Sequence, residues 1–461
     1  MLRQKISRHV SWARFSKCVL LLSFGLLLHL LGGQAMGPPP PAQVRPAKGP
    51  SIKTDRGKYV PPGLPALPPA GGKFNDPVFG TEIMRVTDAS SAPKGAGTNY
   101  SYWPTFNSNN TKLLVSDAAA PMYATIYDFN PETFTLGRRH PPVPYSPPGN
   151  ISVRLDDACW SSTDPDVLYV HQDSGTKIYK YTVSKQSYTL VGDVARVLPP
   201  GQNVQQMGMA LDNDTFSFTK RGGGPDYKFL GYAVYRASTN KILFQDSEAI
   251  DEVKVDKTGN YLLVATNEGG VGKHEVRIVD LNTGQTQNLT DDAPDHAPMH
   301  YDVGSAMAVG NANYLVGITA RSLATPHSYT KILDLSSERN YGGFHLSMLA
   351  DNEAWALVSF YTEHVNAVMQ GEVVQVSTDG VGRVRRLFHH RAVFDSYYDT
   401  PRANISRDGR YVAFSSNWGV KGGRHDMFIA RIPPAPGGGA RPAVPAASRP
   451  RRVSTLNGTH N

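Results

Sequence analysis

Residues 404–417 read NISRDGRYVAFSSN, and residues 426–430 read DMFIA. The first stretch has two short runs of strand-forming residues on either side of Asp408-Gly409. This dipeptide suits a tight hairpin turn, because glycine tolerates positive φ and aspartate caps the turn. The second stretch supplies a third strand. Short β-branched and aromatic runs between turn residues are typical of all-β proteins.

The same cassette recurs along the chain, with a repeat of about 40–45 residues that is typical of propeller blades. Residues 256–265 (DKTGNYLLVA) match it closely, the cassette appears again at 106–116 (FNSNNTKLLVS), and weaker copies follow elsewhere. We therefore predict a seven-bladed β-propeller. The expected blades are 102–138, 152–192, 205–246, 248–290, 299–338, 342–388 and 396–431.

One strand-like stretch, residues 81–87 (TEIMRVT), precedes the first full repeat. We expect it to pair beside residues 426–431 and close the ring. Closure leaves only short, protected sheet edges. It matters here because Cys18 and Cys159 are the two cysteines of the chain, and removal of an N-terminal signal would leave Cys159 alone. Stability must then come from a large core.

The segment Ser406–Ser416 (SRDGRYVAFSS) resembles the repeat of TolB-like β-propellers, which are exported and have four strands per blade. The resemblance implies the fold and says little about function. A weaker resemblance is to oligogalacturonate-lyase-type propellers. These bind a divalent metal, and their last innermost strand begins Gln-x-x-His-x-His-Pro. Tyr397, Thr400 and Arg402 stand at those positions here, so we expect neither a metal nor another cofactor.

The net charge of +8 lies at the ends of the chain. Residues 1–70 hold ten Lys/Arg and one acid, and residues 432–461 hold four Arg and no acid. The remainder, 71–431, therefore has a net charge of −5. A mildly acidic body argues against nucleic acid as a partner of the folded part.

Four segments are expected from these patterns. Residues 1–36 have a cationic start and a 14-residue apolar run, 18–31, which indicates a signal peptide or an uncleaved signal anchor. Residues 37–70 are a Pro-rich linker, 71–432 the propeller, and 433–461 a disordered basic tail rich in Pro, Gly and Ala. We expect a secreted or periplasmic monomer, with a membrane contact only if the anchor stays uncleaved.

Candidate site residues lie near the starts of the innermost strands, which meet at one rim of the channel. The wider set is aromatic or hydrogen-bonding: Tyr100, Tyr102, Trp103, Arg154, Asp156, Asp157, Gln205, Gln206, Asp251, Glu252, His300, Tyr301, Asp302, His345, Tyr397, Tyr398 and Arg402. For ligand binding we favour Trp103, Arg154, Asp157 and Asp302. The alternative is that such residues cap turns and fill the channel.

Two functions follow from this rim. The first is a protein- or glycan-binding module that takes an envelope protein or an acidic or neutral glycan. The alternative is a carbohydrate-active enzyme, a metal-independent polysaccharide lyase acting on a uronic-acid-containing glycan. Elimination needs a base, an acid and a cation on the carboxylate. The candidate catalytic residues are His300, His345, Tyr301, Tyr397 and Arg402.

Overall fold

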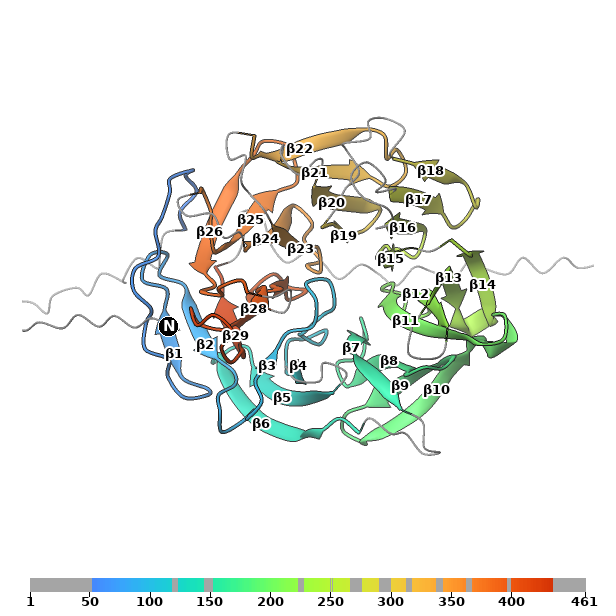
Figure 1. Cartoon of the computed structure of the whole chain (residues 1–461), viewed down its shortest axis with the longest axis horizontal. Helices are drawn as coiled ribbons and strands as arrows, with labels where there is room; N and C mark the ends of the chain where they lie inside the picture. Colours follow the sequence, from blue (N-terminus) through green and yellow to red (C-terminus); the bar gives the residue numbers. More distant parts are fainter. Residues whose placement is uncertain are drawn as a thin grey trace, which may run out of the picture. The chain divides into compact units, whose positions relative to one another are not determined.

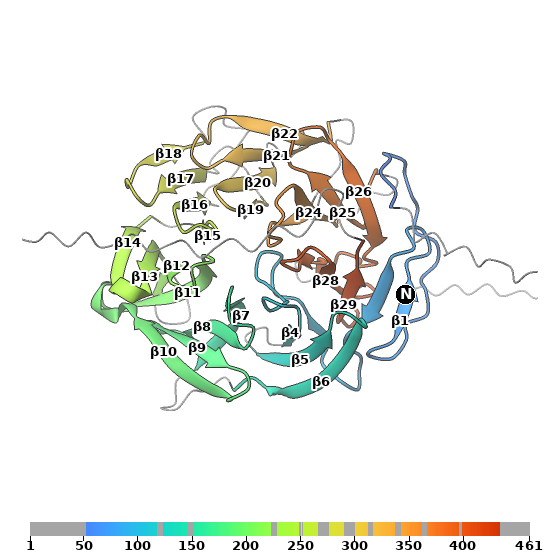
Figure 2. The same cartoon turned by 180° about the vertical axis from the view of Figure 1, so that it is seen from behind.

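A computed structural model of the chain describes residues 52–117, 123–144, 152–222, 228–248, 250, 252–265, 276–289, 300–311, 317–336, 343–361, 367–395 and 399–433. Within these ranges the protein is almost entirely β. Seven antiparallel sheets are arranged radially around a central axis (Figures 1 and 2). The predicted seven-bladed β-propeller is confirmed.

The first three blades take up the chain from residue 96 to residue 246. Blade 1 consists of β3 (Ala96–Gly97), β4 (Lys112–Asp117), β5 (Ala124–Asn130) and β6 (Thr135–Pro142). Blade 2 consists of β7 (Val153–Trp160), β8 (Val167–Gln172), β9 (Lys177–Thr182) and β10 (Ser187–Asp193). Blade 3 consists of β11 (Gln202–Met209), β12 (Thr215–Gly222), β13 (Phe229–Arg236) and β14 (Lys241–Asp246). Short 3-10 turns occupy Val194–Arg196 and Ala237–Thr239.

The next three blades follow the same up-and-down order. Blade 4 consists of β15 (Glu252–Val255), β16 (Tyr261–Ala265), β17 (Val276–Asp280) and β18 (Thr286–Asn288). Blade 5 consists of β19 (Asp302–Val303), β20 (Met307–Asn311), β21 (Gly317–Ser322) and β22 (Tyr329–Asp334). Blade 6 consists of β23 (Phe344–Ser347), β24 (Trp355–Phe360), β25 (Glu372–Ser377) and β26 (Val384–His389).

Blade 7 joins the two ends of the described chain. It holds β27 (Asn404–Ile405), β28 (Tyr411–Ser416) and β29 (Asp426–Arg431), followed outward by β2 (Glu82–Arg85) and β1 (Lys73–Asn75). In the β2–β29 pairing, Met84 lies opposite Ile429 and Ile83 opposite Ala430. The expected closing strand is therefore confirmed, and β1 adds a fifth strand that the repeat pattern did not predict.

The core is divided among the interfaces between blades. One apolar cluster of described residues fills each of the seven interfaces. The second and third strands are covered on both faces, so β24 and β28 are buried along their whole length. This explains why their sequences are continuous apolar or small-residue runs rather than alternating ones.

Side chains on the inner strands also form hydrogen bonds that link one blade to the next. Each accepts a hydrogen bond from a backbone N–H of the following blade. The pairs are Asp157 with Met207, Ser217 with Val255, Asp302 with Met348, Ser347 with Ile405, and Ser415 with Thr98. The last of these lies at the ring closure.

Replacing Ser415 with alanine is expected to lower the free energy of unfolding by about 1–2 kcal/mol, because a buried N–H loses its acceptor. Thr98 is 5% exposed, and its N–H lies 2.9 Å from Ser415 Oγ. Urea titration followed by tryptophan fluorescence measures the change. Ser328→Ala, at an exposed serine of blade 5, is the matched control. Equal midpoints for the two variants would contradict the assigned role of Ser415.

Residues 52–70 do not behave as the unpacked linker we expected. Lys53 forms a β-bridge with Arg386, and Trp418 Nε1 donates to the Pro65 carbonyl at 2.9 Å. Extended proline-rich backbone keeps its carbonyl groups free of internal hydrogen bonds, so they remain available to donors on blades 6 and 7. We call residues 52–70 the N-terminal strap.

The structure does not test the predictions made for the two ends of the chain. The signal or anchor at 1–36 and the tail beyond Pro433 lie outside the described residues. Among the residues that are described, no helix is long and apolar enough to cross a membrane.

Candidate functional site

Two of the predicted histidines meet near the inner edges of the blades. His345 lies in β23, and His300 immediately precedes blade 5. Their ring centroids are 6.0 Å apart. The His345 ring is also 4.6 Å from that of Tyr100 and 4.7 Å from that of Tyr361. Residues from blades 1, 5 and 6 therefore converge on a single imidazole.

A cation completes this group. Arg402, which precedes β27, has its guanidinium carbon 5.6 Å from the Tyr100 ring centroid. Its backbone has φ 45°, and its carbonyl accepts a hydrogen bond from Thr98 Oγ1. We call His345, His300, Tyr100, Tyr361 and Arg402 the His345 cluster. Three of the five predicted catalytic residues are thus brought together.

His345 is the unusual member. It is 1% exposed, and neither of its ring nitrogens has a hydrogen-bond partner among the described residues. Burial lowers its pKa well below the ordinary value, with further lowering from the charges of His300, Arg402 and Lys254. Burial also lowers the pKa of His300. Both imidazoles are therefore neutral at pH 7. Buried polar atoms are normally satisfied, so the two unsatisfied nitrogens make this ring a candidate for contact with a ligand.

A buried lysine, Lys254 of β15, lies near the cluster and lowers the pKa of His345 further. Its Nζ lies 3.0 Å from the Tyr102 ring centroid and 4.6 Å from that of Tyr301, and it donates to the Tyr301 carbonyl at 2.9 Å. Burial lowers the pKa of Lys254, while nearby Glu252 and Asp302 act in the opposite direction. The predicted catalytic residue Tyr301 accordingly packs against this lysine.

The predicted ligand-binding carboxylates are engaged in holding blades together. Asp302 accepts from the backbone N–H groups of Val303 and Met348. Asp157 accepts from Met207 N–H and from His171 Nε2, each within 2.9 Å. Both side chains are about 4% exposed. These contacts match the alternative we left open, in which inner-strand residues fill the channel.

Arg154 is engaged within blade 2, whereas Trp103 borders the cluster, with its ring centroid 6.4 Å from that of Tyr100. Arg154 pairs with Asp156 at 2.5 Å and lies 3.6 Å from Asp173, all within blade 2. Trp103 stacks beside Tyr102, with centroids 4.7 Å apart, and its Nε1 donates to the Met207 carbonyl. Tyr397 lies outside the described residues.

Sequence reasoning missed Lys254 and Tyr361. Lys254 sits between Val253 and Val255 in a short inner strand, and alternation should have placed it facing the channel while the valines pack on other blades. Tyr361 directly follows β24 and carries no comparable signal, because its position depends on how blade 6 sits against blade 7.

A divalent metal does not fit the described part of the cluster. Among the described residues no three His, Cys, Asp or Glu side chains gather in a metal-binding arrangement. Two imidazoles are present, but Lys254 and Arg402 are close enough to depress the pKa of His345. A cation there would be repelled by both charges.

No family model matches this sequence, and no curated protein matches it. Among solved structures, the chain is similar to an oligogalacturonate lyase in complex with manganese, with 13% identity and a TM-score of 0.58. That alignment covers 80% of this chain and 97% of the other. It is also similar to the oligogalacturonate lyase of Vibrio parahaemolyticus, with 12% identity, a TM-score of 0.58, and coverage of 78% and 96%.

At these identities the likeness shows the fold alone. The chain shares the propeller fold of oligogalacturonate lyases along nearly their whole length. The resemblance to TolB-like propellers remains a prediction.

Proposed function

We propose that this protein is an exported β-propeller that binds an acidic glycan at the His345 cluster. The observation that carries the proposal is the buried His345 ring, whose nitrogens have no hydrogen-bond partner among the described residues. Tyr100 and Tyr361 flank it. Aromatic faces pack against the C–H faces of sugars, an imidazole bonds hydroxyl groups, and the guanidinium of Arg402 pairs with a carboxylate.

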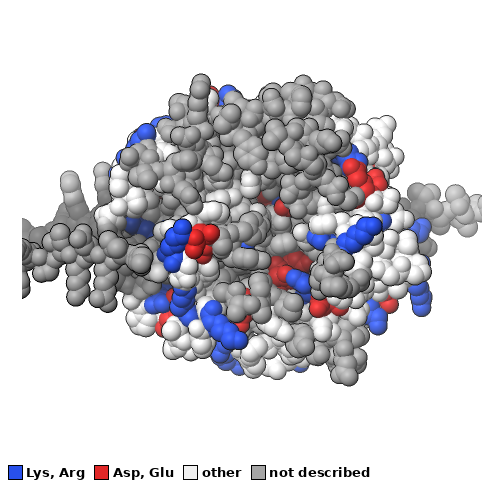
Figure 3. All heavy atoms as spheres, in the orientation of Figure 1, with Lys and Arg blue, Asp and Glu red and all other residues white. Residues whose placement is uncertain are grey.

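Two further points support this class of ligand. The solved neighbours are named for action on oligogalacturonate, a polymer of acidic sugars. The face in Figure 3 shows described basic and acidic side chains interspersed, with no broad area of one sign visible among them. The described side chains on this face therefore give no support to recognition through a broad charged surface. Export is supported by the sequence of residues 1–36.

His345→Ala is expected to weaken the binding of trigalacturonate at least about tenfold, which corresponds to about 1.4 kcal/mol. Isothermal titration calorimetry measures the affinity. Arg402→Gln should weaken the binding of the acidic trimer. It should leave the binding of a neutral trisaccharide unchanged, because the substitution removes only the partner of the carboxylate. His327→Ala, at an exposed histidine, is the control. A wild-type protein that binds neither sugar, or a His345→Ala variant that binds normally, would refute the proposal.

A metal-independent lyase is the second candidate, favoured by the position of the unpartnered His345 ring beside Tyr100 and Tyr361, with Arg402 next to Tyr100. A neutral imidazole can remove the C5 proton of a uronic acid. The electron pair forms the C4–C5 double bond, the C4–O bond breaks, and an acid protonates the leaving oxygen. Arg402 would neutralise the carboxylate. The unsaturated product absorbs ultraviolet light. A protein that binds oligogalacturonates without producing this absorbance is a binding module and not a lyase.

A further inference from the structure

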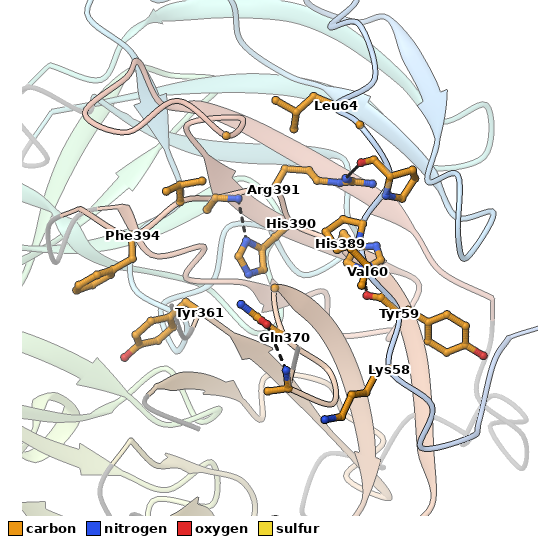
Figure 4. A pocket seen from close by; sticks show the side chains of 18 of the residues that line it. Lys58, Tyr59, Val60, Leu64, Tyr361, Gln370, His389, His390, Arg391 and Phe394 are labelled. Atoms are coloured by element: carbon orange, nitrogen blue, oxygen red, sulfur yellow. Dashed lines mark hydrogen bonds between the residues drawn. The ribbon is translucent and has the colours of Figure 1, made fainter. Parts of the chain in front are cut away.

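A cavity lies between the N-terminal strap and blades 6 and 7, and Tyr361 of the His345 cluster is part of its lining. Its volume is about 650 Å³, and part of its wall is apolar, with Val60 and Leu64 on the strap and Val393 and Phe394 opposite them (Figure 4). This is within the usual range for small-molecule sites, roughly 300–1,000 Å³. We call it the strap pocket.

The pocket is built by contacts between distant parts of the chain. Arg391 Nη1 donates to the Pro62 carbonyl at 2.8 Å, across 329 residues (Figure 4). His389 Nε2 lies 3.2 Å from the Tyr59 carbonyl oxygen. Gly419 has φ 77°, and a Cβ there would lie 2.7 Å from Leu64 Cδ1. The strap is therefore seated closely on blade 7, and its position defines one wall.

The polar part of the lining is cationic. Lys58 is exposed, and no acidic group of the described residues forms an ion pair with it. Arg391 Nη2 is buried without a hydrogen-bond partner among the described residues, and Asp76 lies 3.9 Å away. Lys421 is paired with Asp395. Arg391 therefore mainly holds the strap, and Lys58 is the cation that can meet a ligand. Apolar walls beside this lysine suit a ligand that has both apolar faces and a carboxylate.

Tyr361 connects this pocket with the His345 cluster. Its ring centroid is 4.7 Å from His345 and 6.1 Å from Phe394, and it lines the strap pocket. The strap pocket and the His345 ring therefore lie on either side of one tyrosine, and a polymer bound at His345 would be next to the pocket.

We infer that the strap pocket is a further subsite of the same acidic glycan. It takes a uronic-acid residue farther along the chain held at His345, with Lys58 pairing with the carboxylate and Phe394 packing on the sugar ring. This inference rests on the proposed function. It adds that the protein binds longer acidic oligosaccharides more tightly than short ones.

Affinities for galacturonate oligomers of two to six residues test the inference. In wild-type protein, affinity rises with length. Lys58→Glu should weaken hexamer binding about tenfold and leave the dimer unchanged, because only the longer chain reaches the reversed charge. Gly419→Ala, which displaces Leu64, should act in the same way. Lys185→Glu, at an exposed lysine on the edge of blade 2, is the matched control and should change neither the dimer affinity nor the hexamer affinity.

The outcomes separate the inference from the function beneath it. Dimer binding with no gain for the hexamer overturns the strap subsite and leaves the His345 site standing. Equal weakening of dimer and hexamer by Lys58→Glu also overturns it, since the effect would then be general electrostatics. If no oligomer binds wild-type protein, the proposed function fails and the subsite fails with it.

Discussion

Replacing Arg386 with methionine is expected to lower the free energy of unfolding by about 3–5 kcal/mol. The Arg386 and Glu372 side chains are both 0% exposed and form a bidentate pair between β26 and β25. Burial raises the pKa of Glu372, against the opposing effect of Arg386. Without the guanidinium, a carboxylate is left buried with no adequate partner. Urea unfolding followed by circular dichroism measures the loss.

A double variant distinguishes loss of the ion pair from loss of packing. Arg386→Met with Glu372→Leu should recover much of the stability, because no uncompensated charge remains. Recovery stays incomplete, because Arg386 Nη1 also donates to the strap carbonyls of Asp55 and Gly57. Arg383→Met, at an exposed pair with Asp379, should cost under about 1 kcal/mol. A single Arg386 variant no worse than that control would contradict the prediction.

Acidification from pH 7 to pH 4 is expected to destabilise the protein by about 3 kcal/mol through His390. Its Nε2 lies 2.7 Å from the Phe360 carbonyl oxygen, and its Nδ1 accepts from Ala392 N–H at 3.0 Å. This fixes the neutral tautomer. Burial lowers the pKa of His390 to about 4, and the charges of His389 and Arg391 lower it further.

The sign follows from where the proton binds. The unfolded histidine takes up a proton below about pH 6.5, whereas the folded one stays neutral until about pH 4. Between these values the unfolded state holds more protons, so stability rises with pH and levels off above about 6.5. His345, whose pKa is also lowered, acts in the same direction.

The slope of unfolding free energy against pH, from urea titrations at several values between pH 4 and 7, checks this prediction. His390→Gln should flatten the slope, whatever its stability at pH 7. His327→Gln, at an exposed site, should leave the slope as in wild type. An unchanged slope in His390→Gln would assign the acid sensitivity to other groups.

Local sequence was sufficient for the propeller. The cassette at 404–417 encodes two strands and their turn, and its recurrence predicts the number of blades because each blade folds from neighbouring residues. The long-range pairing of β2 with β29 was also predictable. The strand before the first repeat has no partner there, and the last blade lacks an outer strand, so the two pair when the ring closes. The start of blade 1 was misplaced at 102, because residues between Gly97 and Phe106 leave the regular pairing.

The candidate site was predictable only by blade position. That rule brought His300, His345 and Arg402 to one rim, but it did not separate them from Asp157 and Asp302, which accept backbone N–H groups of the next blade. Lys254 and Tyr361 could be assigned to the site only from the tertiary structure, because their contacts depend on how the blades pack against one another.

The packing of the N-terminal strap could not be predicted from its composition. A Pro-rich segment has too little apolar surface to form its own core, and from this we expected a linker that does not pack. Whether it packs on another surface depends on donors from remote residues, here Arg391, His389 and Trp418. The repeat therefore determined the ring and its closure, because those contacts are local or follow from symmetry. The pocket and the unsatisfied His345 arose from tertiary contacts between segments hundreds of residues apart, which no local pattern encodes.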